Sequence, residues 1–98
     1  MGNEKGLSIE KIAELAFVAT KKYISKEPET VLSVKEEEGG WKVTVEALER
    51  KAVPDTQDIL GRYEIRFNED GEVIGWEQRV VRKRSDRMYP AEEEWTIA

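Results

Sequence analysis

A basic run near the carboxyl-terminal end of the sequence offers the strongest binding chemistry in the chain. Residues 79–87 carry five positive charges and one negative charge, although the whole chain has a net charge of −5. Guanidinium groups form bidentate, charge-assisted hydrogen bonds with carboxylates and phosphates. The run therefore predicts a surface that docks an acidic partner. The candidate partner-binding residues are Arg62, Arg66, Arg79, Arg82 and Arg84.

Two other interpretations of these charges stay open. The first is compensation within the chain, in which Glu46, Glu64 and Glu77 pair with strand arginines, or residues 92–94 fold back on the basic run. The second is a regulator that contacts nucleic acid, for which a steep loss of binding with added salt would be the signature. No recognised nucleic-acid motif accompanies the run and the acidic remainder would repel phosphate, so we expect no nucleic-acid partner.

A pair of carboxylates, Asp55 and Asp58, flanks Thr56 in the longest predicted connection. Two neighbouring carboxylates can act as general acid and base when burial separates their pKa values. The chain has no histidine and no cysteine, however, and it lacks a Gly-rich phosphate loop and a nucleophile elbow. We therefore predict no enzyme activity, no catalytic residue, no metal and no cofactor, and expect Asp55 or Thr56 to cap a short turn. The candidate loop-shaping residues are Pro54, Asp55, Thr56 and Asp58.

Length and composition fit one small globular domain. With 98 residues, of which 39% are hydrophobic and 38% charged, the chain has no room for a second independent core. Its first residues lack the apolar core of a signal peptide, and no stretch approaches the about 18 to 20 apolar residues of a membrane span. We therefore expect a cytoplasmic protein with no membrane partner.

The sequence predicts an amphipathic helix over residues 8–26. Ser8 suits the N-cap position, and Leu7 and Ile12 occupy the positions of a hydrophobic staple. Apolar residues then recur at steps of three and four through this segment. Pro28 disfavours helical geometry at the residue before it, which ends the helix.

After the helix the hydrophobic period changes to two, which predicts four β-strands. Gly39 and Gly40 supply the turn of one hairpin, and residues 68–71, Asn-Glu-Asp-Gly, supply the turn of a second. The last strand is expected to place Ile74, Trp76 and Val80 on one face. The predicted fold class is α+β, with one amino-terminal amphipathic helix packed on a four-stranded antiparallel meander sheet.

The same alternation predicts which side chains form the core and how the chain divides. Residues 1–7 are expected to be a flexible amino terminus, residues 8–84 a single α+β domain, and residues 85–98 a carboxyl-terminal tail. The tail contains Trp95, which could cover a sheet edge, pair with a second copy or act as a docking peptide. The predicted core comprises Ile9, Ile12, Ala13, Ala16, Tyr23, Ile24, Leu32, Val34, Trp41, Val43, Val45, Tyr63, Ile65, Phe67, Ile74 and Trp76.

Four segments, in this order and spacing, resemble the gas vesicle protein O (GvpO) family. They are Gly-Trp-Lys-Val-Thr-Val-Glu-Ala-Leu-Glu at residues 40–49, Pro-Asp-Thr-Gln-Asp-Ile-Leu-Gly-Arg-Tyr-Glu at 54–64, Asp-Gly-Glu-Val-Ile-Gly-Trp at 70–76, and Arg-Val-Val-Arg-Lys-Arg at 79–84. The resemblance covers roughly residues 30 to 84, and the leading helix suits it. The chain departs from the family at Lys83, where members often carry an aromatic residue, and the tail after Asp86 has no match.

The resemblance implies a non-enzymatic accessory protein that assists assembly of the gas vesicle shell. Its partners would then be other gas vesicle proteins, structural or accessory, and it would be cytoplasmic and associated with gas vesicles. An unpaired strand edge or the Trp95 tail would allow a homodimer, although neither requires one. The competing class is a generic helix-on-sheet module that binds a small ligand or peptide between helix and sheet, for which a ligand-dependent rise in melting temperature would be the signature.

Overall fold

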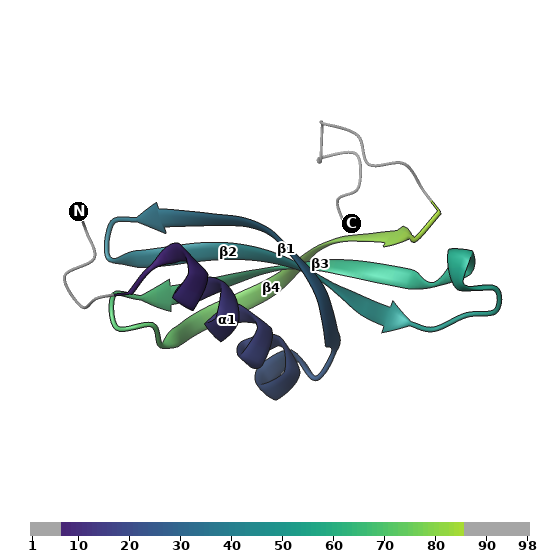
Figure 1. Cartoon of the computed structure of the whole chain (residues 1–98), viewed down its shortest axis with the longest axis horizontal. Helices are drawn as coiled ribbons and strands as arrows, with labels where there is room; N and C mark the ends of the chain where they lie inside the picture. Colours follow the sequence, from purple (N-terminus) through teal and green to yellow (C-terminus); the bar gives the residue numbers. More distant parts are fainter. Residues whose placement is uncertain (1–6, 86–98) are drawn as a thin grey trace.

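One helical segment lies against a four-stranded antiparallel sheet with strand order β1-β2-β3-β4. A computed structural model describes residues 7–85 (Figure 1). The predicted α+β fold is confirmed, and each strand lies beside its neighbour in sequence. The proposed divisions at residues 1–7 and 85–98 lie almost wholly outside the described residues. The elements are α1 (Ile9–Ala19), η1 (Thr20–Ile24), β1 (Glu27–Glu37), β2 (Gly40–Arg50), η2 (Asp55–Gln57), β3 (Ile59–Asn68) and β4 (Val73–Lys83).

The helical segment begins where the sequence predicts. The Ser8 side chain accepts a hydrogen bond from the Lys11 backbone N–H at 3.1 Å and so caps the helix. The final turn, η1, has π-helical hydrogen bonding, and the helix ends at Ser25 in the left-handed conformation (φ 65°). Helical structure thus stops at Ile24, two residues before the predicted end, because β1 begins at Glu27.

The core lies between the helix and the inner face of the sheet, the face turned toward α1. Strands β2 and β3 pair so that Val43 lies opposite Ile65 and Val45 opposite Tyr63. The buried apolar residues of this cluster are Ile12, Ala16, Ala19, Ile24, Trp41, Val43, Val45, Ala47, Tyr63, Ile65 and Phe67. The predicted core is therefore confirmed at nine of its sixteen positions, while Ala13 and Val34 are half-buried.

Bulges in the two edge strands overturn two of the other core predictions. On β1 the register skips Glu29 and Leu32, and on β4 it skips Ile74 and Arg79. Each skipped residue inserts one extra position, so the side chains beyond it change faces. Leu32 and Ile74 are consequently exposed. Val80 lies opposite Arg62 on the outer face of the sheet, which is the face turned away from the helix.

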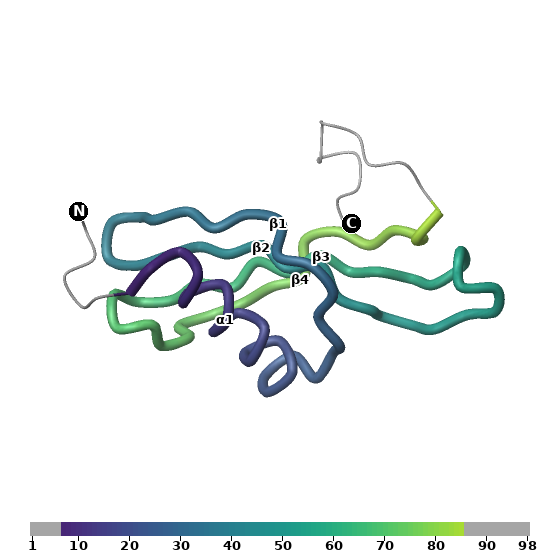
Figure 2. The backbone as a smooth tube through the Cα atoms, in the orientation of Figure 1, coloured from purple at the N-terminus to yellow at the C-terminus, as the bar shows by residue number. Residues whose placement is uncertain are grey.

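The helix packs mainly against β1 and β2 rather than β4. In Figures 1 and 2 it runs diagonally in front of the sheet, from beside the β3–β4 turn to the start of β1. Tyr23 and Trp76, both predicted as core, are exposed for this reason, at 50% and 45%. Ile9, at the first helical position, is also exposed. An 11-residue α-helix extended by one π-helical turn is too short and narrow to cover a twisted sheet of four strands, each 10 or 11 residues long.

Candidate functional site

The outer face of the sheet carries most of the predicted partner-binding arginines. Side chains alternate along β2 and β3, so residues between the buried valines and aromatics point away from the helix. Arg62 lies opposite Glu46, and Glu64 lies opposite Glu77. The first pair is opposite in charge and the second is alike, and Glu64 has its positive partners in Arg66 and Arg79 instead. The charged residues of this face and of the adjoining loop form a buried cluster, an exposed cluster and a loop clamp.

The buried cluster consists of Glu46, Arg62 and Arg82. Arg82 donates two hydrogen bonds to the Glu46 carboxylate, from Nε at 2.9 Å and from Nη2 at 3.0 Å. The Arg62 Nε lies 3.7 Å from the same carboxylate. Their side chains are only 3% to 10% exposed. Ions withdrawn from water to this degree need one another to offset the free-energy cost of desolvation. The cluster therefore serves to hold the fold together.

The exposed cluster surrounds Glu64 on the same face. Arg66 Nη2 lies 3.2 Å from Glu64, and Arg79 Nε lies 3.9 Å from it. Arg79 also hydrogen-bonds Glu77, which together with its charge raises the pKa of the Arg79 guanidinium. Arg66 and Arg79 are 57% and 54% exposed, so an incoming carboxylate could replace their present partners at small cost.

The loop clamp joins the end of β4 to the connection between β2 and β3. Arg84 donates to Asp58 at 3.1 and 3.0 Å and to Glu29 of β1 at 3.0 and 2.7 Å. The buried Asp58 also accepts the Ala52 backbone N–H at 2.8 Å. The hydrogen bonds that Arg84 donates to Glu29 and then to Asp58 raise the pKa of Arg84, which keeps it charged. One guanidinium thereby fastens three parts of the chain.

The loop residues hold the connection through contacts that differ from the predicted ones. Pro54, after a cis peptide bond from Val53, precedes the short helix η2, and no side chain caps that helix. The expectation that Asp55 or Thr56 would do so is wrong: Asp55 pairs with Lys51 at 3.2 Å. The backbone carbonyl of Thr56 instead accepts the Ser85 N–H at 3.1 Å.

Asp58 should make stability depend on acid pH. The Ala52 N–H, followed by Arg84 and Lys51, lowers the pKa of Asp58. Its stabilising contribution is therefore complete above the unfolded pKa of about 3.9 and is lost as the pH falls through the lower folded pKa. Asp58→Asn is expected to lower Tm by about 5 to 10 °C at pH 7, and the two Tm curves should converge below about pH 4.

Thermal denaturation followed by circular dichroism between pH 2.5 and 7 measures this convergence. Asp55→Asn is the matched control, because Asp55 is exposed and pairs only with the exposed Lys51 among the contacts described. It should change Tm by less than about 2 °C. Parallel curves for the native chain and Asp58→Asn would show that Asp58 does not carry the pH dependence.

Metal-ligating chemistry is missing from the part of the chain that the structure describes. Among residues 7–85 no three acidic side chains gather closely enough to hold a metal ion. Over the same residues, no helix is both long and apolar enough to cross a membrane.

Comparison with known proteins identifies the family. A family model described as gas vesicle synthesis protein GvpO matches residues 2–88. This chain belongs to the GvpO family. The predicted resemblance is confirmed, and membership connects the chain with gas vesicle formation; the family is not a known enzyme family.

Three curated GvpO relatives give the extent of the similarity. Gas vesicle protein O of Haloferax mediterranei is 44% identical over 69 residues, which is 69% of this chain and 49% of the relative. Gas vesicle protein O1 of Halobacterium salinarum is 45% identical over 58 residues, which is 59% of this chain and 49% of that relative. Gas vesicle protein O of a Streptomyces species is 43% identical over 63 residues, which is 62% of this chain and 49% of that relative. The chain spans about half the length of these relatives. No solved structure matches it.

The structure separates the five predicted docking arginines of this GvpO-family chain by exposure. Arg66 and Arg79 lie together on the exposed surface. Arg62 and Arg82 instead belong to the buried cluster around Glu46, and Arg84 belongs to the loop clamp. The proposed cross-strand pairing is present in part: Arg62 with Glu46 and Arg79 with Glu64 join neighbouring strands. Arg66 with Glu64 and Arg79 with Glu77 instead pair within one strand. The proposed return of residues 92–94 and every prediction for the Trp95 tail lie outside the described residues.

Sequence reasoning missed two acidic residues that join distant parts of the chain. Glu29 occupies the first bulge of β1, from which it reaches Arg84. Glu49 occupies a bulge of β2 and accepts hydrogen bonds from Tyr63 and, at 2.7 Å, from Gln78, while Lys26 lies 3.5 Å away. A bulge places a side chain off the alternating pattern, so a period of two could not locate either residue.

Proposed function

We propose that this chain is a non-enzymatic assembly factor that binds other gas vesicle proteins through the exposed cluster on its outer face. The observation that carries the proposal is the pair of exposed guanidiniums, Arg66 and Arg79, held around Glu64 on a rigid sheet. GvpO membership supports the gas vesicle context. A partner would present carboxylates to these arginines, in the cytoplasm and in association with the forming vesicle.

The exposed cluster suits reversible docking better than the buried pairs do. Exposed ion pairs contribute only about 0 to 1 kcal/mol, so a partner's carboxylate can exchange with Glu64 or Glu77 without unfolding the chain. Arg82 and Arg84 are committed to Glu46 and to Asp58 with Glu29. We therefore restrict docking to Arg66 and Arg79 and assign Arg62, Arg82 and Arg84 to holding the sheet and loop beneath the docking surface.

The test reverses the charge of both docking arginines in a gas vesicle gene cluster from which the native gene has been deleted. Deletion should abolish pressure-collapsible light scattering, and the native gene should restore it. Arg66→Glu with Arg79→Glu should restore less than about a tenth of the native signal, because the double reversal repels an acidic partner by several kcal/mol. The same protein, purified, should keep its circular dichroism spectrum and its Tm within about 4 °C.

The matched control is Lys11→Glu with Lys21→Glu, which makes the same charge change at exposed helical positions. It should restore vesicles normally. Normal scattering from the folded Arg66/Arg79 variant would overturn the docking surface. Normal scattering from the deletion itself would overturn the assembly role, and the ligand- or peptide-binding module would then be the better hypothesis.

A further inference from the structure

A groove lined by apolar side chains and by Lys22 and Glu72 remains open on the inner face, between the helix and the β3–β4 hairpin. Its volume is about 450 Å³, and its lining includes Leu15 and Val18 of α1, Tyr23 of η1, Phe67 of β3 and Val73 of β4. Val18 and Tyr23 are 58% and 50% exposed. Trp76, which pairs with Ile65 of the inner face, continues the apolar surface along β4 at 45% exposed. Exposed apolar groups gathered in this way indicate a contact surface.

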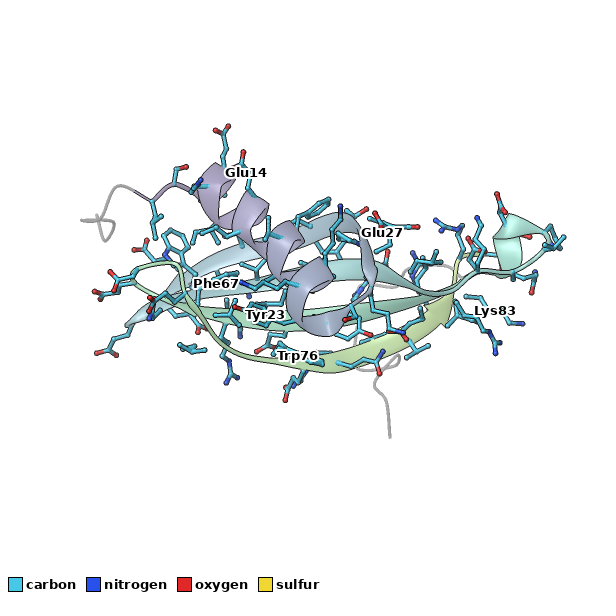
Figure 3. All side chains as sticks on the ribbon, turned by 90° about the horizontal axis from the view of Figure 1, so that it is seen from below. Glu14, Tyr23, Glu27, Phe67, Trp76 and Lys83 are labelled. Atoms are coloured by element: carbon cyan, nitrogen blue, oxygen red, sulfur yellow. The ribbon has the colours of Figure 1, made fainter. Side chains whose placement is uncertain are left out.

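Figure 3 shows β4 running along the open side of the helix, with Tyr23 and Trp76 on the two elements that border the opening. The opening exists because α1 lies over β1 and β2. An apolar sheet face normally needs a covering layer, and the described chain supplies only one helix for four strands. We therefore expect the uncovered part of the inner face to be the contact surface for another molecule.

We infer that the occupant is a second copy of this chain, bound groove to groove across a two-fold axis. The charges at the ends of the groove carry this inference. The acidic end is the β3–β4 turn, where a Cβ on Gly71 would lie 3.0 Å from Leu15, and it carries Glu72. The basic end, about 10 Å farther along the helix, carries Lys22.

This polarity makes the groove complementary to itself. When the two-fold axis is perpendicular to the groove, the second groove runs in the opposite direction, so the Glu72 end of one copy meets the Lys22 end of the other. The apolar residues of both copies then face one another between two zones of opposite charge. The same residue pair forms twice in such an interface, because each copy contributes both an acidic and a basic end.

The edges of the sheet are poor alternatives for self-association. Both edge strands carry two bulges, at Glu29 and Leu32 on β1 and at Ile74 and Arg79 on β4. Bulges interrupt the row of free backbone groups that edge-to-edge pairing requires. A groove dimer needs about 500 Å² from each copy to reach the lower limit of specific interfaces, less than a tenth of the 6337 Å² surface. Interfaces of that size are typically transient, so we expect micromolar affinity.

Sedimentation equilibrium of the full chain at several concentrations up to about 1 mM tests the dimer. Val18→Glu should raise the dimer dissociation constant at least tenfold, because it puts a charge into the middle of the apolar contact. Ile74→Glu is the matched control, since Ile74 is 63% exposed but projects from a bulge outside the groove lining. It should change the dissociation constant less than about twofold.

A charge exchange then distinguishes groove pairing from any other contact. Lys22→Glu alone should weaken the dimer, and Lys22→Glu combined with Glu72→Lys should restore it, because the two ends remain complementary after the exchange. A native chain that stays monomeric at every concentration overturns the proposal. So does equal weakening by Val18→Glu and Ile74→Glu, or a double variant no better than Lys22→Glu. These readouts do not involve vesicle formation, so they are independent of the assembly role.

Discussion

Glu46→Ala is expected to lower the free energy of unfolding by about 3 to 5 kcal/mol, one of the two largest effects we predict for a single substitution. The Glu46 carboxylate receives two hydrogen bonds from Arg82 and lies 3.7 Å from Arg62 Nε. Removal of the carboxylate takes away the negative charge that two nearly buried guanidiniums share. The desolvation cost of both cations then remains without its main compensation, and this cost exceeds the value of the lost hydrogen bonds themselves.

Urea denaturation at neutral pH measures the change, and two further variants make the result specific. Glu77→Ala removes another carboxylate that binds an arginine of β4, but this pair is more than half exposed, so the loss should stay below about 1 kcal/mol. Glu46→Gln keeps the side-chain volume and one acceptor oxygen and should lie between the two. A loss below about 1 kcal/mol for Glu46→Ala would show that the buried cluster is not a structural device.

The sequence predicts the architecture well because the central strands follow the ideal period. In β2 and β3 every second residue is apolar from Trp41 to Ala47 and from Tyr63 to Phe67, and these residues pair directly. The Ser8 cap and the Gly39–Gly40 turn depend on local chemistry alone. Such features need no knowledge of the rest of the fold.

Prediction from the sequence fails at the edge strands because their residues depart from the period of two. On β1 the inner residues Pro28, Val31 and Val34 are spaced by three, because each intervening bulge adds one residue opposite Ala47, Val45 and Val43 of β2. A strict period of two instead selects Leu32. A bulge is stabilised by contacts that the edge strand makes after folding, such as Glu29 with Arg84, and those contacts are far apart in the sequence.

For the candidate site, the sequence predicts which charged residues share a face, but it does not predict which of them are buried. Charge pattern alone identifies which arginines face away from the helix, and it anticipates their pairing with Glu46, Glu64 and Glu77. It does not distinguish the buried Arg82 from the exposed Arg79. Burial depends on the twist of the sheet and on the Arg79 bulge, which moves Val80 and Arg82 to the outer face. Tertiary geometry therefore decides which charges support the fold and which can meet a partner.

Gly40→Ala is expected to cost about 3 kcal/mol, although it adds a single methyl group. Gly40 lies opposite Asn68, and a Cβ at this position would lie 2.9 Å from the Asn68 Cα and closer still to the Phe67 carbonyl oxygen. These are backbone atoms of β3, so no side-chain rotation can relieve the overlap. The β2–β3 pair must separate at the point where Trp41 and Phe67 enter the core. Urea denaturation should therefore show a lower midpoint, and hydrogen exchange should be faster at the β1–β2 turn.

Gly39→Ala is the control that separates crowding from backbone conformation. Gly39 has φ +86°, and a Cβ there would meet no atom within 4 Å, so alanine should cost only about 1 to 2 kcal/mol for the left-handed conformation. Asn tolerates that conformation better than Ala, and Gly39→Asn should recover most of this loss. Asn at Gly40 should recover nothing, because the obstacle there is the β3 backbone. Equal costs at both glycines, or recovery by Gly40→Asn, would contradict the close packing of β2 against β3 at the start of the hairpin.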